Sequence, residues 1–460
     1  MLSFCFSVGA LDLVPTKDLL ASYLEHDSDL MKSAINLQKI KLDQEVSDID
    51  SGFSIQLSTG AVKFVFDDKN LSLSPNVNIS FPNYSNFNTK VSAEISSKSG
   101  VNDVSIKTSA DLLSNTKTLE INRLKNQRKL LEAERELSSK VLEKEQAFYK
   151  NLQTLLTDTS SIISKQQDYY SDKINFEKIK AQGYAKSSST YRRAEMKVID
   201  DEHDIESKER SLIYDYQVFY TECGYEIEIE NVSDYMLLIP SDIEMVEPLN
   251  VKDFPSATYN LIEKAVWNQK IAELERAADR NYSFGANAGY TFLKDGKSDS
   301  IDLGIDGTYS GVTLSLGVEL PVSEPNKTAL TLSAKVNPNT FKKEKIEAQK
   351  QELELKEESI TLESAISSYD KKVQEKKLKL EQLLWAKNTN DRNYSMYENL
   401  ENDMYKWFKQ GIISESEYLS AKVNREKSFV SQISNYIDMI VYNSEIRAMF
   451  TTNEKINRDE

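Results

Sequence analysis

Residues 312–320 read Val-Thr-Leu-Ser-Leu-Gly-Val-Glu-Leu, and every second residue of this stretch is apolar. Such strict alternation is typical of a β-strand with one apolar and one polar face, because successive side chains point to opposite faces. The stretch is also about as long as a tilted strand must be to cross the hydrocarbon layer of a membrane. It therefore predicts a strand whose apolar side is covered by lipid or by a protein core.

Three neighbouring stretches alternate in the same way. Their apolar positions are 284, 286, 288, 290 and 292 in the first, 301, 303, 305 and 309 in the second, and 330, 332, 334 and 336 in the third. The sequences between the stretches are Lys294-Asp-Gly-Lys297, Ser310-Gly311 and Ser323-Glu-Pro-Asn326. Residues of these types favour turns. We therefore expect four strands within residues 283–336.

A second region of alternating residues lies at 53–111. Its apolar positions form four rougher runs, which begin at Phe53, Leu71, Val91 and Val104. The alternation changes phase between Leu57 and Val62. This change predicts a β-bulge near Gly60, since a bulge inserts one extra residue into a strand.

Two features of these regions separate a lipid-facing sheet from a soluble β-sandwich, which shows the same alternation. The polar positions hold mainly small residues rather than Lys and Glu. Aromatic residues stand near the predicted strand ends, at Phe81, Tyr290, Phe292 and Tyr309. Both features are typical of transmembrane strands, whose aromatic residues lie at the membrane interfaces. The sequence therefore favours lipid on the apolar side.

A long stretch with heptad spacing follows each strand region. Val141, Phe148, Leu155 and Ile162 follow one another at intervals of seven, and so do Ile346, Leu353 and Ile360. This spacing predicts coiled-coil helices at 115–182 and 341–409. Each would have about 68 residues and extend roughly 100 Å, at about 1.5 Å per residue. Taken alone, such helices would indicate only a rod.

The order of elements occurs twice. Phe176-Glu-Lys-Ile-Lys-Ala-Gln-Gly183 has a counterpart in Met404-Tyr-Lys-Trp-Phe-Lys-Gln-Gly411, whose glycine lies 228 positions later (411 minus 183). A medium helix, a strand region, a long helix and a returning helix surround each glycine. In the first repeat, 11–222, these elements are 17–50, 53–111, 115–182 and 185–222; in the second, 256–450, they are 256–281, 283–336, 341–409 and 412–450. Residues 223–255 are either a plain linker or an equatorial belt, and residues 451–460 form a C-terminal tail.

The N-terminus reads as a targeting segment. Residues 1–10 resemble the apolar end of a signal peptide, with small residues at 8–10 before a cleavage site. No basic residue precedes this apolar segment. Either the true start lies upstream or this segment is a short apolar N-terminus, and we favour an upstream start.

Composition argues against nucleic-acid binding and against catalysis. The net charge is -16, whereas phosphate binding needs clustered Lys and Arg. The two cysteines and two histidines stand at no metal-ligand spacing, and neither a nucleophile–base set nor a phosphate loop is present. No run of 18 apolar residues offers a transmembrane helix. We therefore expect no enzyme, no cofactor and no metal.

Across nearly the whole chain after residue 12, these features resemble the TolC-type outer-membrane factor family. The resemblance rests on the duplication, the two long helices, the stretch Gly311–Pro321 and the residues around the second glycine. Those residues are Tyr405, Gly411, Ile412, Glu417, Leu419 and Ala421. The resemblance implies an α+β fold, mainly α, that is internally duplicated. Long coiled-coil helices would form a periplasmic α-barrel, and three copies would share one transmembrane β-barrel.

The resemblance also implies a function and partners. A homotrimer would lie in the lipid of the cell outer membrane, with its helical part in the periplasm. It would act as the passive export duct of a tripartite efflux or type I secretion system, with a periplasmic adaptor protein and an inner-membrane pump. Gly183 and Gly411 would allow tight turns at the periplasmic tips. Tyr184 and Ile412, beside these glycines, would contact the adaptor.

Glu417 is the candidate constriction residue that the resemblance implies, and Glu415 is an alternative partner. Ser189 stands at the Glu417 position of the first repeat, so that repeat would contribute no acid. Three copies of Glu417 around an axis would repel one another and attract cations. The alternative is that both acids only stabilise the first turn of the returning helix.

Two questions stay open at this level. The family usually has two strands in each repeat, or twelve in a trimer, whereas the alternation supports four in each repeat, or twenty-four in a trimer. We favour twelve, with the surplus strands in hairpins beyond the membrane. The runner-up function is a surface-anchored coiled-coil structural or adhesion protein with a β domain, which would form no channel.

Overall fold

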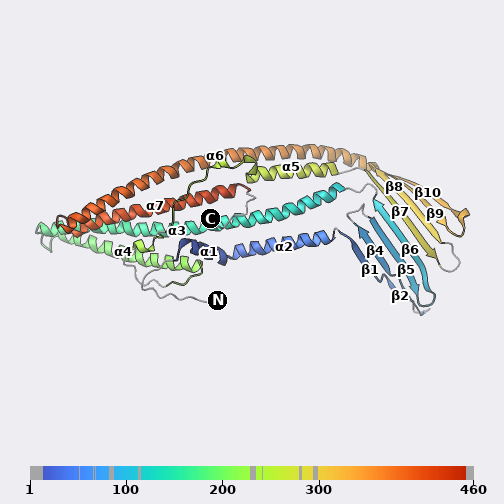
Figure 1. The fold of residues 1–460 in the computed structure, drawn as a ribbon, viewed down its shortest axis with the longest axis horizontal. Helices are drawn as coiled ribbons and strands as arrows, with labels where there is room; N and C mark the ends of the chain where they lie inside the picture. The colour runs from blue at the N-terminus through green and yellow to red at the C-terminus, as the bar shows by residue number, and fades with distance from the viewer. Residues whose placement is uncertain are drawn as a thin grey trace. The chain divides into compact units, whose positions relative to one another are not determined.

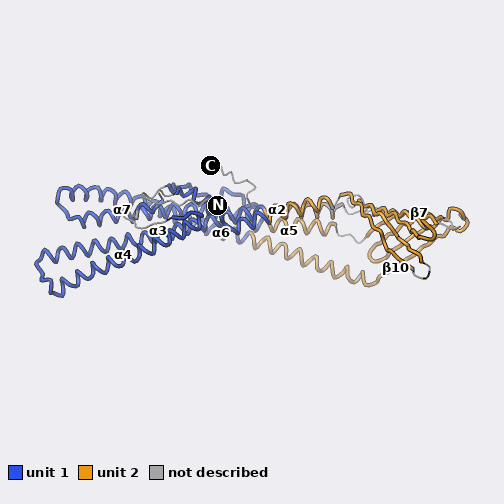
Figure 2. The backbone as a smooth tube through the Cα atoms, turned by 90° about the horizontal axis from the view of Figure 1, so that it is seen from below, with its two compact units in different colours: residues 1–35, 134–263, 366–460 blue, residues 36–133, 264–365 orange. Residues whose placement is uncertain are grey.

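The structure is a computed structural model. It describes residues 14–50, 52–65, 67, 69–81, 87–111, 116–227, 235–240, 242–278, 282–293 and 299–451. The expected signal segment (1–10) and residues 452–460 of the expected tail lie outside the described residues. The chain forms two compact units, which we call unit 1 (1–35, 134–263 and 366–460) and unit 2 (36–133 and 264–365) (Figure 2).

Unit 2 contains a ten-stranded antiparallel sheet to which both repeats contribute (Figure 1). The first repeat supplies β1 (Ser54–Ser58), β2 (Val62–Val65), β3 (Asn70–Leu73), β4 (Asn76–Phe81), β5 (Phe87–Ser96) and β6 (Gly100–Asp111). The second supplies β7 (Tyr282–Leu293), β8 (Ser300–Tyr309), β9 (Val312–Pro321) and β10 (Ala329–Val336). The strand order is β1-β4-β5-β6-β7-β8-β9-β10. The repeats meet where residues 103–111 of β6 pair with residues 285–293 of β7.

The first repeat differs from the expected strand pattern. Its described residues form six strands instead of four. Instead of a bulge near Gly60, β1 ends at Ser58 and β2 begins at Val62, and Gly60 between them has a φ of 62°. The run that begins at Leu71 is divided into β3 and β4 beside Pro75, because proline has no N–H for a ladder.

The surplus strands also differ from expectation. Eight strands follow one another along a single path, and β2 and β3 lie off this path, where β3 pairs with β5. Among the described strands, only β2 and β3 therefore form a hairpin beside the main path, and the number of strands that cross the membrane stays a prediction. Each strand inside the path has an antiparallel neighbour on both sides, which satisfies its backbone N–H and C=O groups.

Seven α-helices stand in the described residues. They are α1 (Thr16–His26), α2 (Ser28–Asp50), α3 (Thr116–Ala181), α4 (Ser189–Glu222), α5 (Asn260–Ala278), α6 (Pro338–Lys409) and α7 (Glu415–Met449). Four short 3₁₀ turns are η1 (Tyr235–Leu238), η2 (Val251–Asp253), η3 (Ser256–Thr258) and η4 (Pro325–Lys327). The bounds of α3 to α7 lie within four residues of the expected ones. The segment expected as linker or belt, 223–255, contains η1 and η2.

All four connections between the sheet and the helices leave from one end of the sheet. In sequence β1 follows α2, α3 follows β6, β7 follows α5 and α6 follows β10 (Figure 1). The register places the corresponding strand ends together, because Asp111 is opposite Gly285, Tyr282 is opposite Tyr309, and Val312 is opposite Val336. The even number of strands on the path returns the chain to the helical side.

Within unit 2, α5 is held against α3 and α6 by cationic side chains. Arg276 of α5 donates two hydrogen bonds to the Glu358 carboxylate of α6, at 2.7 and 3.1 Å. Arg128 of α3 lies over the ring of Trp267 of α5, 5.1 Å from its centroid. Bidentate pairing and guanidinium stacking both depend on the planar shape of arginine.

Unit 1 holds a buried apolar core contributed by α1, α3, α4, α7 and η1. Phe148, Leu155 and Ile162, three of the heptad residues of α3, are at most 4% exposed. The heptad residues of α6 in unit 2 are different, because Ile346, Leu353 and Ile360 are 62, 68 and 55% exposed. A single chain therefore packs the apolar seam of α3 but leaves that of α6 uncovered.

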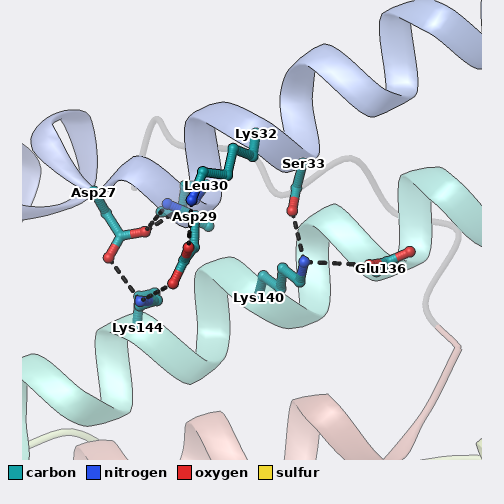
Figure 3. Close-up of polar contacts among 8 residues, drawn as sticks. All are labelled: Asp27, Asp29, Leu30, Lys32, Ser33, Glu136, Lys140 and Lys144. Atoms are coloured by element: carbon teal, nitrogen blue, oxygen red, sulfur yellow. Dashed lines mark hydrogen bonds and ion pairs between the residues drawn. The ribbon is translucent and has the colours of Figure 1, made fainter.

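The helix expected at 17–50 is divided into α1 and α2 at Asp27 (Figure 3). Oδ1 of Asp27 accepts hydrogen bonds from the backbone N–H groups of Asp29 and Leu30, both at 2.9 Å, and so caps α2. Its Oδ2 lies 2.7 Å from Nζ of Lys144 on α3. Burial raises the pKa of Asp27, but the hydrogen bonds from Lys144 and from the backbone outweigh this effect and lower it. A charged cap with a distant partner therefore fixes the break.

Candidate functional site

The second glycine turn ends α6 with a Schellman motif. The N–H of Gly411 donates to the carbonyl of Phe408 at 2.9 Å, and the N–H of Ile412 donates to that of Trp407 at 2.9 Å. Gly411 has a φ of 71°, and a Cβ added there would meet no atom within 4 Å. A glycine is therefore favoured here because the backbone is left-handed, and not because a side chain would lack space.

The first glycine turn is similar at its start but longer. Gly183 has a φ of 76°, and its N–H donates to the carbonyl of Lys180 at 3.1 Å. The turn then spans residues 182–188 between α3 and α4, whereas its counterpart spans 410–414 between α6 and α7. Because the first turn has seven residues and the second has five, corresponding residues of the two repeats are no longer 228 positions apart after the glycine.

This difference in length corrects one expected correspondence. Ser188 and Ser414 are the N-caps of α4 and α7. Counted from these caps, the residue that corresponds to Glu417 is Tyr191 and not Ser189. Tyr191 is 7% exposed and packs against the ring of Phe176, with centroids 5.1 Å apart. The first repeat therefore places a packed aromatic residue where the second has an acid.

Both turns present exposed apolar groups. Tyr184 and Ile412 are 46 and 65% exposed, as a contact surface requires. The end of α6 adds Tyr405 and Trp407, which are 45 and 44% exposed. Trp407 is not among the site residues predicted from the sequence, although an aromatic residue four positions before the turn glycine is a usable signal. Contact of these residues with an adaptor stays a prediction.

The aromatic residues near the second turn are held in place by α7. Tyr418 stacks on Phe408 with centroids 5.5 Å apart and an interplanar angle of 7°. It also lies 5.4 Å from the ring of Tyr405. The hydroxyl of Ser416 donates to the Glu177 carboxylate of α3 at 3.3 Å, which links the start of α7 to α3 inside unit 1. The aromatic residues of the second turn are therefore fixed by the first turns of α7.

Glu417 has a defined local role in the chain. Its carboxylate accepts hydrogen bonds from the backbone N–H of Ser414 at 2.9 Å and from the hydroxyl of Ser414 at 3.0 Å. The N–H of Glu417 in turn donates to that hydroxyl at 3.3 Å, which completes a capping box. Glu415 is exposed in the same turn. This geometry matches the helix-stabilising alternative, and a constriction by either acid stays a prediction.

The sheet presents one continuous apolar face. Residues that stand opposite each other in an antiparallel pair point to the same face, so the register assigns the faces. One row across the sheet is Leu57, Val77, Val91, Ile106, Tyr290, Ile301 and Leu320. We call the face that contains this row the apolar face. Its other apolar members include Ile79, Val104, Phe292, Leu303, Ile305, Leu314, Leu316, Val318, Leu330, Leu332 and Val336.

The apolar face is uncovered in the single chain. Leu57, Leu330 and Leu332 are 75, 70 and 75% exposed, and Leu316, inside the sheet, is 41% exposed. A contiguous apolar surface across eight strands is far beyond the scattered apolar residues of an ordinary soluble surface. It requires a cover of lipid or protein.

The opposite face, which we call the polar face, carries small polar residues and glycine. One of its rows is Ser80, Asn88, Ser109, Asn287, Gly304, Gly317 and Thr331. Cross-strand hydroxyl pairs recur on it, such as Ser92 with Ser105 at 2.9 Å and Thr308 with Thr313 at 3.1 Å. The sheet therefore separates an apolar from a hydrated side.

None of the helices in the described part of the chain is both long and apolar enough to cross a membrane.

Comparison with known families matches both halves of the chain. Residues 19–243 match the model of the TP096X N-terminal domain, and residues 244–453 match that of the TP096X C-terminal domain. No curated protein matches the chain.

Several solved structures are similar to the chain. The outer membrane protein VceC of Vibrio cholerae has 11% identity and a TM-score of 0.44, with 94% of each chain covered. The CmeC outer membrane channel of Campylobacter jejuni has 10% identity and a TM-score of 0.44, over 95% of this chain and 87% of that one. The MtrE outer membrane channel of Neisseria gonorrhoeae has 14% identity and a TM-score of 0.43, over 94% and 88%. All three of these proteins are outer-membrane proteins.

Proposed function

The chain belongs to the TP096X family, with one N-terminal and one C-terminal domain, and we propose that it is a subunit of a passive outer-membrane export conduit. The observation that carries the proposal is the sheet with one continuous apolar and one polar face. Lipid would cover the apolar face, and a water-filled lumen would lie along the polar face. This is the side-chain pattern of transmembrane strands.

The aromatic residues support a membrane position for the sheet. On β7 the apolar face begins at Tyr282 and Phe284 and ends at Tyr290 and Phe292. Ten residues separate Tyr282 from Phe292, which is about 34 Å along a strand at roughly 3.4 Å per residue. A tilt of roughly 40° reduces this length to about 26 Å across the membrane, close to the apolar band between two aromatic girdles. Phe81 and Phe87 would join the girdle at the Tyr282 end.

Several copies of the chain would close the sheet. No further strand pairs with β1 or β10 among the residues that the structure describes. Because eight strands alternate in direction along the path, β1 and β10 run in opposite directions. The β10 edge of one copy therefore has the direction needed to continue the antiparallel ladder at the β1 edge of the next. A homotrimer of this kind would have twenty-four strands (three times eight), in place of the twelve that we favoured from the sequence.

The helices would extend the conduit into the periplasm. The exposed apolar seam of Ile346, Leu353 and Ile360 on α6 would pack against a helix of a neighbouring copy. The exposed turn residues Tyr184 and Ile412 would contact a periplasmic adaptor protein, which links the conduit to an inner-membrane pump of a tripartite efflux or type I secretion system. Glu415 and Glu417 would lie near the axis of the closed tip.

The first prediction concerns conductance. We expect the purified oligomer to conduct ions when it is reconstituted into a planar lipid bilayer, because the polar face would enclose a hydrated path. A surface-anchored structural protein with a solid coiled-coil core would not conduct. A homotrimer that inserts into the bilayer but never conducts would contradict the proposed function.

A further inference from the structure

One row of the polar face carries four charges, arranged as two like-charged pairs. The register places Lys90 opposite Lys107, and Lys107 opposite Gly289. Gly289 is opposite Asp302, and Asp302 is opposite Glu319. We call Lys90, Lys107, Asp302 and Glu319 the charged row. It runs across five neighbouring strands, with both lysines on one side of Gly289 and both acids on the other.

The two halves of the charged row nearly meet at the glycine. A Cβ added at Gly289 would lie 3.5 Å from Cγ of Lys107 and 3.6 Å from Oδ2 of Asp302. Lys90 and Glu319, at the outer positions, are both exposed. Neighbouring strands are about 4.8 Å apart, so the lysine and acid ends of the row are separated by roughly 19 Å over four strand spacings.

This arrangement does not serve the stability of the sheet. Like charges directly opposite each other on antiparallel strands destabilise a sheet. The cost is a few tenths to about 1 kcal/mol per pair, similar in size to the stabilisation that a pair of opposite charges would give. Alternating the four charges would convert both unfavourable pairs into favourable ones. The rows on either side are uncharged where they cross the same strands, with Ser92, Ser105, Thr291 and Ser300 on one side. Lysines and acids are therefore segregated within this one row, and a second like-charged pair, Glu94 opposite Asp103, lies two rows away on β5 and β6.

We propose that the charged row is a charge filter of the conduit, with a basic sector and an acidic sector in each copy. The inference rests on the proposed function, since it places the polar face along the lumen. In a closed homotrimer, three basic and three acidic sectors would alternate around the wall of the lumen. Because the strands of a barrel tilt by roughly 40°, the lysine and acid ends of each row would differ in depth by about 12 Å. Anions would pass preferentially along the lysines and cations along the acids. The six sectors together would have almost no net preference.

Other charges lie on the polar face but outside this row. Glu94 stands opposite Asp103, and Asp306 and Lys335 lie in two further rows. Asp306 also fills the space over Gly285, where an added Cβ would lie 2.9 Å from Oδ1. Asp306 and Lys335 are therefore suitable for matched control substitutions of the same two charge types.

The second prediction tests the charged row by reversal potentials in planar bilayers under a KCl gradient. We expect Lys90→Gln/Lys107→Gln to shift the reversal potential toward that of a cation-selective pore. Asp302→Asn/Glu319→Gln should shift it by a similar amount toward anion selectivity. Both shifts should be large at about 10 mM salt, where the screening length is roughly 30 Å, and should vanish near 1 M, where it is roughly 3 Å.

The controls separate this inference from the proposed function. Each control removes one charge, so it is compared with a charged-row variant that also removes one, Lys107→Gln or Asp302→Asn. Lys335→Gln and Asp306→Asn should shift the reversal potential much less than these single charged-row variants. Equal shifts in control and charged-row variants, or no shift in a conducting charged-row variant, would overturn the charge filter while leaving the conduit intact. A wild-type oligomer that does not conduct would instead contradict the proposed function itself.

Discussion

Leu316→Lys should prevent most of the protein from inserting into lipid vesicles as a folded oligomer. Leu316 lies on β9 inside the sheet, opposite Ile305 and Leu332 on the apolar face. If lipid covers this face, a lysine there must be placed in hydrocarbon, which costs about 2–4 kcal/mol near the middle of the membrane. Three copies would carry that cost three times in one homotrimer. The fraction of protein that runs as a heat-resistant oligomer after vesicle insertion measures the effect.

The neighbouring residue provides the matched control. Ser315 precedes Leu316 on the same strand but points to the polar face, opposite Asp306 and Ser333. Ser315→Lys adds the same charge at nearly the same depth, and it should insert as well as the wild type. Equal insertion of Leu316→Lys and Ser315→Lys would mean that lipid does not cover the apolar face.

Phe148→Ala should lower the free energy of unfolding of unit 1 by about 3–5 kcal/mol, the usual cost of removing a buried phenyl ring. Phe148 is 0% exposed, and its ring lies 5.6 Å from Tyr23, 5.3 Å from Tyr149 and 5.3 Å from Phe219, centroid to centroid. These rings come from α1, α3 and α4, so the cavity would weaken three helices together. Urea unfolding followed by the helical circular dichroism signal measures the loss.

An exposed aromatic residue on α4 serves as the reference. Tyr214 is 64% exposed, and Tyr214→Ala should change the free energy of unfolding by no more than about 0.5 kcal/mol. The core assignment would be wrong if Phe148→Ala were as mild as Tyr214→Ala. The fraction of protein that inserts into lipid vesicles can be measured for the same variants. Phe148→Ala should lower this fraction less than Leu316→Lys does.

Local patterns in the sequence predict much of the fold because they reflect local geometry. The alternation over 312–320 follows from the two faces of a strand, and the heptad residues of α3 follow from the helical repeat. The left-handed glycines 183 and 411 also act locally, since each ends its own helix. These features need no knowledge of distant residues.

The features that the sequence does not predict depend on distant partners or on register. The helix break at Asp27 is fixed in part by Lys144, which lies 117 positions away (144 minus 27). The correspondence of Glu417 with Tyr191 depends on turns of unequal length. The charged row exists only because β6 pairs with β7 in one register, and a slip by one residue would turn Lys107 to the apolar face.

The number of strands is a further case. Pro75 divides one alternating run into β3 and β4, and the alternation on both sides of a proline does not reveal which half stays in the main path. The capping box of Ser414 and Glu417, by contrast, is readable from the sequence, since a serine followed three residues later by glutamate is its usual signature.

The central claim is that lipid covers one face of the sheet and water the other, and alternate labelling of β9 tests it most directly. Single cysteines at positions 313 to 318 would carry a fluorophore in the reconstituted oligomer, with a lipid-borne quencher in the bilayer. The sequence has two native cysteines, of which Cys223 is buried, and the wild-type protein measures their background labelling. We expect strong quenching at 314, 316 and 318 and weak quenching at 313, 315 and 317. Uniform quenching, or its absence at the even positions, would contradict the account.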